Sequence, residues 1–176
     1  FDKGGKLMGL GYPAGKTIDD LAKTGDKSKF DFPIGLKSSA DARLSFSGLK
    51  TSMRLRLEKN PELLESPNPD LCASYQDAIV KALLLKARYA IKSIKEQFNV
   101  KDFPIVIGGG VACNSAIRSA FTEKHTNVHI VEPHYCTDNG AMIANYTLRI
   151  QEQAIPFPEC LELDSRGRFI NKKDFV

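Results

Sequence analysis

The chain has 176 residues, with 42% hydrophobic residues, 26% charged residues and a formal net charge of +4. This length and balance predict one globular domain, or one domain with an appendage, with enough residues for a buried core. No stretch approaches the roughly 20 consecutive apolar residues of a membrane span, so no membrane partner is expected. The four cysteines form no CxxC pair, which argues against a disulfide framework or a zinc site and favours a reducing, cytoplasmic location.

The N-terminal segment predicts short helices separated by an irregular turn. The chain begins at Phe1 without a start methionine or a signal peptide, so it is expected to be a piece of a longer protein. Residues 2–9 have the spacing of the end of a helix, and residues 9–15 are too rich in glycine and proline for regular structure. Thr17 is expected to cap a short helix over residues 18–24.

Two segments with alternating polarity follow. Residues 30–34 and 44–48 each alternate and predict short strands, which form a hairpin or neighbouring edge strands. A helix is expected next, because apolar residues recur at every fourth position: Leu49, Met53 and Leu57.

A linker-like section over residues 60–69 leads into one long helix, expected over residues 70–98. Its wide apolar face predicts a central packing helix, and lysines occupy its other faces. Basic residues gather between residues 37 and 59 and again along this helix. They permit contact with a phosphate backbone, but solvated helix faces are the commoner explanation.

The most informative stretch is the strand expected over residues 103–107, which runs into three glycines at 108–110. Glycines at the end of a buried strand let a ligand approach the backbone, and Asn114 is placed to cap a helix over residues 115–124. The free N–H groups of such a helix attract anions. The glycines are contiguous, so the stretch is neither a GxGxxG fingerprint nor a Walker loop. A nucleotide cradle and a simple packing turn both remain open.

The C-terminal part continues the alternation of strands and helices. Residues 128–131 predict a strand, and a helix is expected from the segment after Cys136 to about Gln153. Residues 156–176 are expected to form a tail that runs over the surface. This alternation indicates an α/β layered domain with a partly parallel sheet.

Asp138 is the sharpest single candidate for chemistry, because it follows a strand and a loop and precedes an apolar helix. A carboxylate in that place can ligate a hard metal ion or cap the helix, and both interpretations remain open. His125 and His129 have the spacing of two ligands on a helix face, but His129 falls in an expected strand, so the pair is not interpreted as a metal site. His134 is a better candidate for a metal ligand, because it lies in the loop directly before Asp138.

Several motifs occur together in this order: Phe1-Asp-Lys, Leu10-Gly-Tyr-Pro-x-Gly15 with Ile18-Asp19, Phe46-Ser-Gly-Leu-Lys-Thr51, Ala73-Ser-Tyr-Gln76, Gly109-Gly-Val-Ala-x-Asn114 and Cys136-Thr-Asp-Asn-Gly-Ala-Met-Ile-Ala144. In this combination the chain resembles the C-terminal half of the tRNA N6-adenosine threonylcarbamoyltransferase (TsaD) family, formerly named O-sialoglycoprotein endopeptidases. The resemblance spans about residues 1 to 150.

This resemblance implies an actin-like ATPase (ASKHA) architecture of RNase-H-like lobes, here one α/β lobe with a mixed sheet flanked by helices and extra helices at its N-terminal side. It implies residues 1–155 as the transferase fold, with a helical and hairpin insertion over 1–66 and an α/β core over 67–155. Residues 156–176 would be the C-terminal surface tail.

The implied activity is transfer of threonylcarbamoyl from threonylcarbamoyl-adenylate to N6 of the adenosine next to the tRNA anticodon, with release of AMP. The adenylate or ATP would be held by residues that match the family's motifs: Asp2, Gly15, Asp19, Gly109, Gly110 and Asn114. Asp138 would ligate a divalent metal, expected to be iron. No residue is assigned as a catalytic base. The implied partners are tRNA, a TsaB-like paralogue, a TsaE-like ATPase and a second copy of the chain as a homodimer.

Two departures from the family's pattern matter. The other two metal ligands belong to a histidine pair in the N-terminal half, which this sequence lacks, so the piece is expected to be inactive alone. The usual glycine before Gly15 is Ala14. Two other hypotheses remain: a different actin-like-fold ATPase such as a sugar kinase, or a non-enzymatic interaction module.

Overall fold

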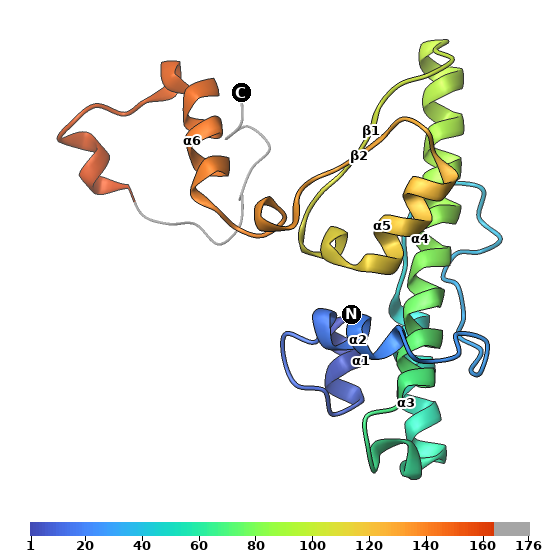
Figure 1. The fold of residues 1–176 in the computed structure, drawn as a ribbon. Helices are drawn as coiled ribbons and strands as arrows, with labels where there is room; N and C mark the ends of the chain where they lie inside the picture. Colours follow the sequence, from blue (N-terminus) through green and yellow to red (C-terminus); the bar gives the residue numbers. More distant parts are fainter. Residues whose placement is uncertain (164–176) are drawn as a thin grey trace. The chain divides into compact units, whose positions relative to one another are not determined.

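The computed structural model describes residues 1–163, which fall into two compact units: Phe1–Thr137, called unit 1, and the part from Asp138 onward, called unit 2 (Figure 1). The expected boundary between a core and a tail at residue 155 stays a prediction. Part of the expected tail, residues 164–176, lies outside the described residues. Among the described residues, no helix is both long enough and apolar enough to cross a membrane.

Unit 1 combines α-helices, short 3-10 helices (η) and two strands. In chain order these are α1 (Asp2–Leu7), α2 (Gly15–Ala22), α3 (Ser47–Lys59), η1 (Pro61–Leu64), α4 (Pro69–Phe98), β1 (Ile105–Ile107), η2 (Gly110–Cys113), α5 (Ser115–Lys124), β2 (Val128–Ile130) and η3 (Pro133–Tyr135). Unit 2 contains α6 (Gly140–Arg149), η4 (Gln151–Gln153) and η5 (Glu159–Glu162).

Helix α4 is the long central element of unit 1, as the sequence predicts (Figure 1). Asn68 caps it by accepting a hydrogen bond from the N–H of Leu71 at 2.9 Å, and Pro69 occupies its first turn, where no N–H partner is needed. Helices α2 and α5 both pack against α4. The apolar face is buried only in the first half, since Ile94 and Phe98 are 37% and 63% exposed.

The main core of unit 1 lies where α1, α2 and α3 meet the first half of α4. The expected apolar face of α3 is confirmed, because its residues Leu49, Met53 and Leu57 are all buried. Helix α1 comes close to its neighbours through glycines. A Cβ atom on Gly4 would overlap the ring of Tyr75.

Strands β1 and β2 form a parallel pair in which Ile105 is opposite Val128 and Ile107 is opposite Ile130. Helix α5 connects the two strands, so β1, α5 and β2 make one βαβ unit. Ile117 and Phe121 of α5 are buried in a second apolar cluster beside this pair. The expectation of an α/β fold with parallel strands is therefore confirmed.

The hairpin expected from residues 30–34 and 44–48 is wrong: residues 30–34 and 44–46 are irregular, and Ser47 already begins α3. The alternating aromatic residues have a different use: the guanidinium of Arg56 lies 5.1 Å from the ring centre of Phe30 and 5.3 Å from that of Phe32. The alternation of residues 30–34 thus reflects packing against a cation on α3 rather than strand pairing.

The expected start of the second helix is also wrong. Helix α2 begins at Gly15, so Thr17 lies inside it and does not cap it. The start is set instead by Asp2, whose carboxylate accepts a hydrogen bond at 2.9 Å from the N–H of Ala14, the residue directly before the helix. A contact twelve residues away along the chain decides this boundary, and local sequence does not reveal it.

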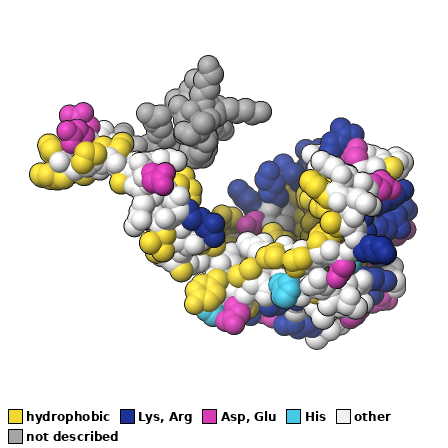
Figure 2. All heavy atoms as spheres, turned by 90° about the horizontal axis from the view of Figure 1, so that it is seen from above, with side chains coloured by type: hydrophobic (Ala, Val, Ile, Leu, Met, Phe, Trp, Pro, Cys, Tyr) yellow, Lys and Arg dark blue, Asp and Glu magenta, His cyan; other side chains and the backbone are white. Residues whose placement is uncertain are grey.

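Lys86 of α4 is the largest departure from the expected solvated lysine faces. Its side chain is only 2% exposed, and Nζ donates hydrogen bonds of 2.7 Å to the carbonyl oxygens of Leu36 and Ser39. The ammonium group therefore fastens the irregular loop between α2 and α3 to the central helix. Lys81, Lys92 and Lys95 of α4 are exposed, as expected. In Figure 2, Lys and Arg side chains of unit 1 lie at several places with acidic side chains among them.

Unit 2 exposes much of its apolar surface. Ile143, Leu148 and Phe157 are 68%, 68% and 78% exposed. The helix expected to reach about Gln153 ends at Arg149 and is followed by the short η4.

Candidate functional site

Unit 1 contains a groove of about 620 Å³ between the N-terminal helices and the turn that joins β1 to α5. Five of the six residues predicted to hold a nucleotide line it: Asp2, Gly15, Asp19, Gly110 and Asn114. The first three come from α1 and α2, and the last two from the turn roughly one hundred residues later. The fold thus brings together residues that the sequence only suggested as a set. The sixth, Gly109, lies directly before the lining residue Gly110.

The three glycines after β1 serve three different purposes. A Cβ on Gly108 would lie 3.3 Å from Cγ2 of Val131, so this position is closely packed. Gly109 has φ +85°, a conformation that side-chain-bearing residues rarely adopt. A Cβ on Gly110 would meet nothing within 4 Å. The first two glycines therefore form the packing turn, and the third leaves the groove open.

Asn114 is the expected cap of α5: its Oδ1 accepts a hydrogen bond of 3.0 Å from the N–H of Ile117. Its Nδ2 donates a 2.6 Å hydrogen bond to Oε1 of Gln76 on α4. Both side chains are buried. The amide that was predicted to contact adenosine is therefore also a structural link between the turn and the central helix.

Two of the three carboxylates that line the groove, Asp2 and Asp19, also have backbone partners. Asp19 accepts hydrogen bonds from the N–H of Ser115 at 3.0 Å and from its hydroxyl at 2.8 Å, so it ties α2 to the start of α5. Asp2 accepts the N–H of Ala14. A carboxylate has about four acceptor positions, so each retains capacity for the hydroxyl groups of a ligand.

The rim of the groove carries a compact charged group on α2. Asp20 accepts hydrogen bonds from Nζ of Lys16 at 2.6 Å and from Nζ of Lys23 at 2.7 Å, and these two bonds lower the pKa of the carboxyl group to about 2. All three residues line the groove. One carboxylate faces two ammonium groups, so Lys16 and Lys23 provide positive charge for an anion at the rim, while Asp2 and Asp19 add negative charge to the lining of the groove.

An apolar recess of about 310 Å³ adjoins the groove and shares Phe1 and Val111 with it. Leu49 and Ile79 are among its other lining residues, so it lies over the main core. The groove and the recess together offer polar and apolar surface side by side, as binding sites for small ligands commonly do.

Asp138 belongs to unit 2, where it is exposed. The helix cap of α6 is Asn139, whose Oδ1 accepts a 3.2 Å hydrogen bond from the N–H of Met142, so Asp138 does not act as that cap. Residues 1–163 contain no cluster of three or more His, Cys, Asp or Glu side chains that is suited to a metal ion. A metal held by Asp138 therefore requires ligands from elsewhere.

The positions of His125 and His129 agree with the prediction that the two do not form a metal site on one helix face. His125 directly follows α5 and His129 lies in β2, so the two do not share a helix face. His134 lies in η3, where its Nδ1 is 3.5 Å from a carboxylate oxygen of Glu132.

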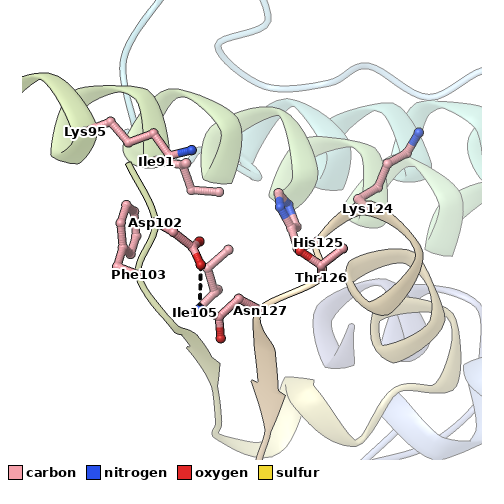
Figure 3. A pocket seen from close by; sticks show the side chains of 9 residues that line it. All are labelled: Ile91, Lys95, Asp102, Phe103, Ile105, Lys124, His125, Thr126 and Asn127. Carbon is pink, nitrogen blue, oxygen red and sulfur yellow. Dashed lines mark hydrogen bonds between the residues drawn. The ribbon is translucent and has the colours of Figure 1, made fainter. Parts of the chain in front are cut away.

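A second recess, of about 190 Å³, lies between the end of α4 and the α5–β2 connection (Figure 3). Lys95 and Lys124 stand on opposite sides of it, and Asn127 donates a 3.1 Å hydrogen bond to Asp102 across its floor. None of the predicted site residues lines this recess. The groove is therefore the stronger candidate.

Three supporting features of the groove were not assigned a role from sequence. Gln76 belongs to a quoted motif, but only the fold shows that it holds Asn114. Ser115 follows Asn114 and donates hydrogen bonds to the carboxylate of Asp19. The charged rim has a local signal, since Lys16 and Lys23 lie four and three residues from Asp20, the spacings at which helical side chains meet.

Residues 1–145 match the sequence pattern of the family described as tRNA N6-adenosine threonylcarbamoyltransferase. A curated protein of this name from a Nitratiruptor species is 42% identical over 147 residues, which cover 81% of this chain and 43% of that protein. Its counterpart from an Anaeromyxobacter species is 44% identical over 149 residues, covering 82% and 43%. The Bradyrhizobium diazoefficiens protein is 35% identical over 174 residues, covering 97% and 48%. The chain thus spans less than half the length of these curated relatives.

Proposed function

Because this chain belongs to the tRNA N6-adenosine threonylcarbamoyltransferase family, we propose that it is the nucleotide-binding part of an acyltransferase that modifies tRNA. The full-length protein transfers threonylcarbamoyl from threonylcarbamoyl-adenylate to N6 of the adenosine beside the anticodon. One observation carries the proposal: the groove gathers Asp2, Gly15, Asp19, Gly110 and Asn114 from distant parts of the chain.

The groove suits an adenylate for three physical reasons. Asp2 and Asp19 have acceptor capacity for ribose hydroxyls. Gly15 and Gly110 leave space, since a Cβ on Gly110 meets nothing within 4 Å and one on Gly15 reaches only Cβ of Phe1 at 3.9 Å. The ammonium groups of Lys16 and Lys23 on the rim favour a phosphate.

In the proposed reaction the N6 amine attacks the carbonyl carbon of the threonylcarbamoyl group. The bond between that carbon and the phosphate oxygen breaks, AMP leaves with the electron pair, and the attacking nitrogen releases one proton to water. Lys16 and Lys23 on the rim favour the negative charge that collects on AMP. Their carboxylate partner, Asp20, holds both ammonium groups in place.

A divalent metal, iron in our proposal, would take Asp138 as one ligand. The site fits in part: the carboxylate is exposed and is not used as the helix cap, and an anionic oxygen is a good donor to a hard cation. When bound, such a metal supplies positive charge that polarises a carbonyl group. The remaining ligands would come from the rest of the full-length protein. We expect Asp138→Ala to lower the metal content of that protein, measured by elemental analysis.

We further propose an actin-like lobe whose other half closes the groove, so that this piece alone is inactive. The expected setting is the cytoplasm, with tRNA as substrate and with a TsaB-like paralogue, a TsaE-like ATPase and a second copy of the chain as partners. A nucleotide held from one side keeps only part of its buried surface, which is why the isolated piece should bind weakly.

The function is tested by mass analysis of nucleosides from unmodified tRNA. The full-length protein and its partners are incubated with threonine, bicarbonate, ATP and the enzyme that makes the adenylate. The proposal expects N6-threonylcarbamoyladenosine, which disappears when the full-length protein is omitted. Equal amounts with and without the protein would refute it, and phosphorylation of a sugar without modified tRNA would indicate a kinase instead.

A further inference from the structure

Cys113 and Cys136 are brought together by the fold although they lie 23 positions apart in the sequence. Cys113 is the last residue of η2 and Cys136 directly follows η3, and these two short helices pack against each other. Both residues bond to the same carbonyl oxygen, that of Pro133, so they lie side by side. We propose that Cys113 and Cys136 form an intramolecular disulfide when the protein meets a hydroperoxide.

The local backbone holds the pair in place through shared acceptors. The carbonyl oxygen of Pro133 accepts the N–H of Cys136 at 3.1 Å and the S–H of Cys113 at 3.7 Å. The carbonyl oxygen of Val131 accepts the S–H of Cys136 at 3.3 Å and an N–H of the Arg118 guanidinium at 3.0 Å. One carbonyl therefore joins both cysteines, and a second joins one cysteine to an arginine.

Arg118 fixes the two segments to each other. The same guanidinium nitrogen donates to the carbonyl oxygens of Ala112 and Val131 at 3.0 Å each. Its positive charge stabilises a thiolate at Cys113 and lowers the pKa of that thiol, although burial and the neighbouring Cys136 raise this pKa by more. The thiolate is therefore a minor form of Cys113 at neutral pH, and the charge of Arg118 partly offsets the raised pKa.

Because the two cysteines differ in solvent exposure, they act in different steps of the proposed oxidation. Cys113 is exposed and lines the groove, whereas Cys136 is buried. The Cys113 thiolate attacks one oxygen of the hydroperoxide, the O–O bond breaks, and an alcohol or water leaves with the proton. The sulfur of Cys136 then attacks the resulting sulfenic acid, the S–O bond breaks, and water leaves. The two thiols supply the two electrons that reduce the peroxide.

The other two cysteines provide internal controls. Cys72 is fully buried in the main core, and burial raises the pKa of its thiol to about 11, so it should remain reduced. Cys160 is partly exposed and lies in unit 2. A general oxidation of accessible thiols would modify Cys160 as readily as Cys113. The proposed pair would instead form one specific disulfide, between Cys113 and Cys136.

The experiment treats the reduced full-length protein with hydrogen peroxide, blocks the remaining thiols with iodoacetamide and digests it with trypsin. The proposal expects a linked pair of peptides, residues 102–118 and 125–149, that vanishes after reduction. Cys160→Ser should leave this link unchanged, and either Cys113→Ser or Cys136→Ser should abolish it. In Cys136→Ser, the sulfenic acid on Cys113 should become trappable by dimedone. Oxidation of Cys113 in the wild type without the linked peptides would overturn the proposal.

The disulfide should also alter the groove, because Cys113 and Thr137 both line it. This consequence rests on the proposed function: we expect the peroxide-treated protein to bind ATP at least tenfold more weakly, with recovery after reduction. Unchanged ATP affinity in fully cross-linked protein would refute the consequence. The disulfide-linked peptides are measured without nucleotide. Their presence or absence therefore tests the disulfide independently of the proposed nucleotide site.

Discussion

Replacement of Lys86 by methionine tests how the irregular loop between α2 and α3 is held. Methionine keeps an apolar stem of similar length and removes the ammonium group, which donates to Leu36 and Ser39 at 2.7 Å each. A hydrogen bond to a charged group contributes about 1.5–3 kcal/mol. Removing a buried cation recovers part of its desolvation cost, and the released loop carbonyls can bind water. We expect a net loss of about 2 kcal/mol in the free energy of unfolding.

The backbone of Leu36 adds a local reason for this loss. Its φ of +53° is unusual for a bulky residue and stores about 1–2 kcal/mol of strain. The hydrogen bond from Lys86 to the Leu36 carbonyl helps to hold that conformation. In Lys86→Met the loop should open, and trypsin should cleave after Lys37 and Arg43 as much as about 30-fold faster, since each 1.4 kcal/mol is a factor of ten.

The assay is urea denaturation together with timed trypsin digestion of the full-length protein. Lys92→Met is the matched control, because Lys92 lies on the same helix with its side chain 71% exposed and only a 3.7 Å ion pair to Glu96. The control should lose less than about 0.5 kcal/mol. The reasoning is refuted if Lys86→Met unfolds like Lys92→Met and its loop is cleaved no faster than in the wild type.

Two further predictions concern contacts around the groove. A Cβ on Gly5 would overlap the Cβ of Ala14. Gly5→Ala should therefore lower the free energy of unfolding by about 1–3 kcal/mol in urea denaturation. Adding Ala14→Gly should recover most of this loss, and no recovery would show that another contact is responsible. Asn114→Ala removes a helix cap and leaves the buried amide of Gln76 without its partner, so it should cost about 2–4 kcal/mol by the same assay. A cost below about 1 kcal/mol would contradict both roles assigned to Asn114.

The sequence predicts the long and strongly patterned elements well. The stripe of Leu49, Met53 and Leu57 and the single long helix α4 are both present, because helical periodicity over many residues leaves few alternatives. The parallel pair of strands flanking α5 is also present. These elements depend on local pattern, which is what a single sequence contains.

Three of the failures share one cause, which is contact between distant residues. The alternating aromatics Phe30 and Phe32 pack on Arg56 instead of pairing as a strand. Lys86 is buried because loop carbonyls reach it from about fifty residues away. The start of α2 depends on Asp2. In each case a tertiary contact overrides a short local pattern, as expected where the pattern covers only a few residues.

The candidate site was predictable as a set of residues but not in its construction. The quoted motifs contain all of the groove's predicted residues, yet they do not reveal that Asn114 and Asp19 also hold the fold together. An alanine substitution at either residue would therefore lower both ligand binding and stability, and the two effects would not be separable. The groove glycines avoid this problem, because a side chain can be added at Gly110 without meeting protein atoms near its Cβ.

The most direct measurement is the ATP affinity of the full-length Gly110→Leu protein by calorimetry. The leucine would project into the groove, so we expect at least a tenfold loss of affinity, or about 1.4 kcal/mol. Gly48→Leu is the matched control, because a Cβ there also meets nothing within 4 Å and Gly48 lies on α3 outside the groove. It should bind ATP like the wild type. Wild-type affinity in Gly110→Leu would contradict the assignment of this groove to the adenylate.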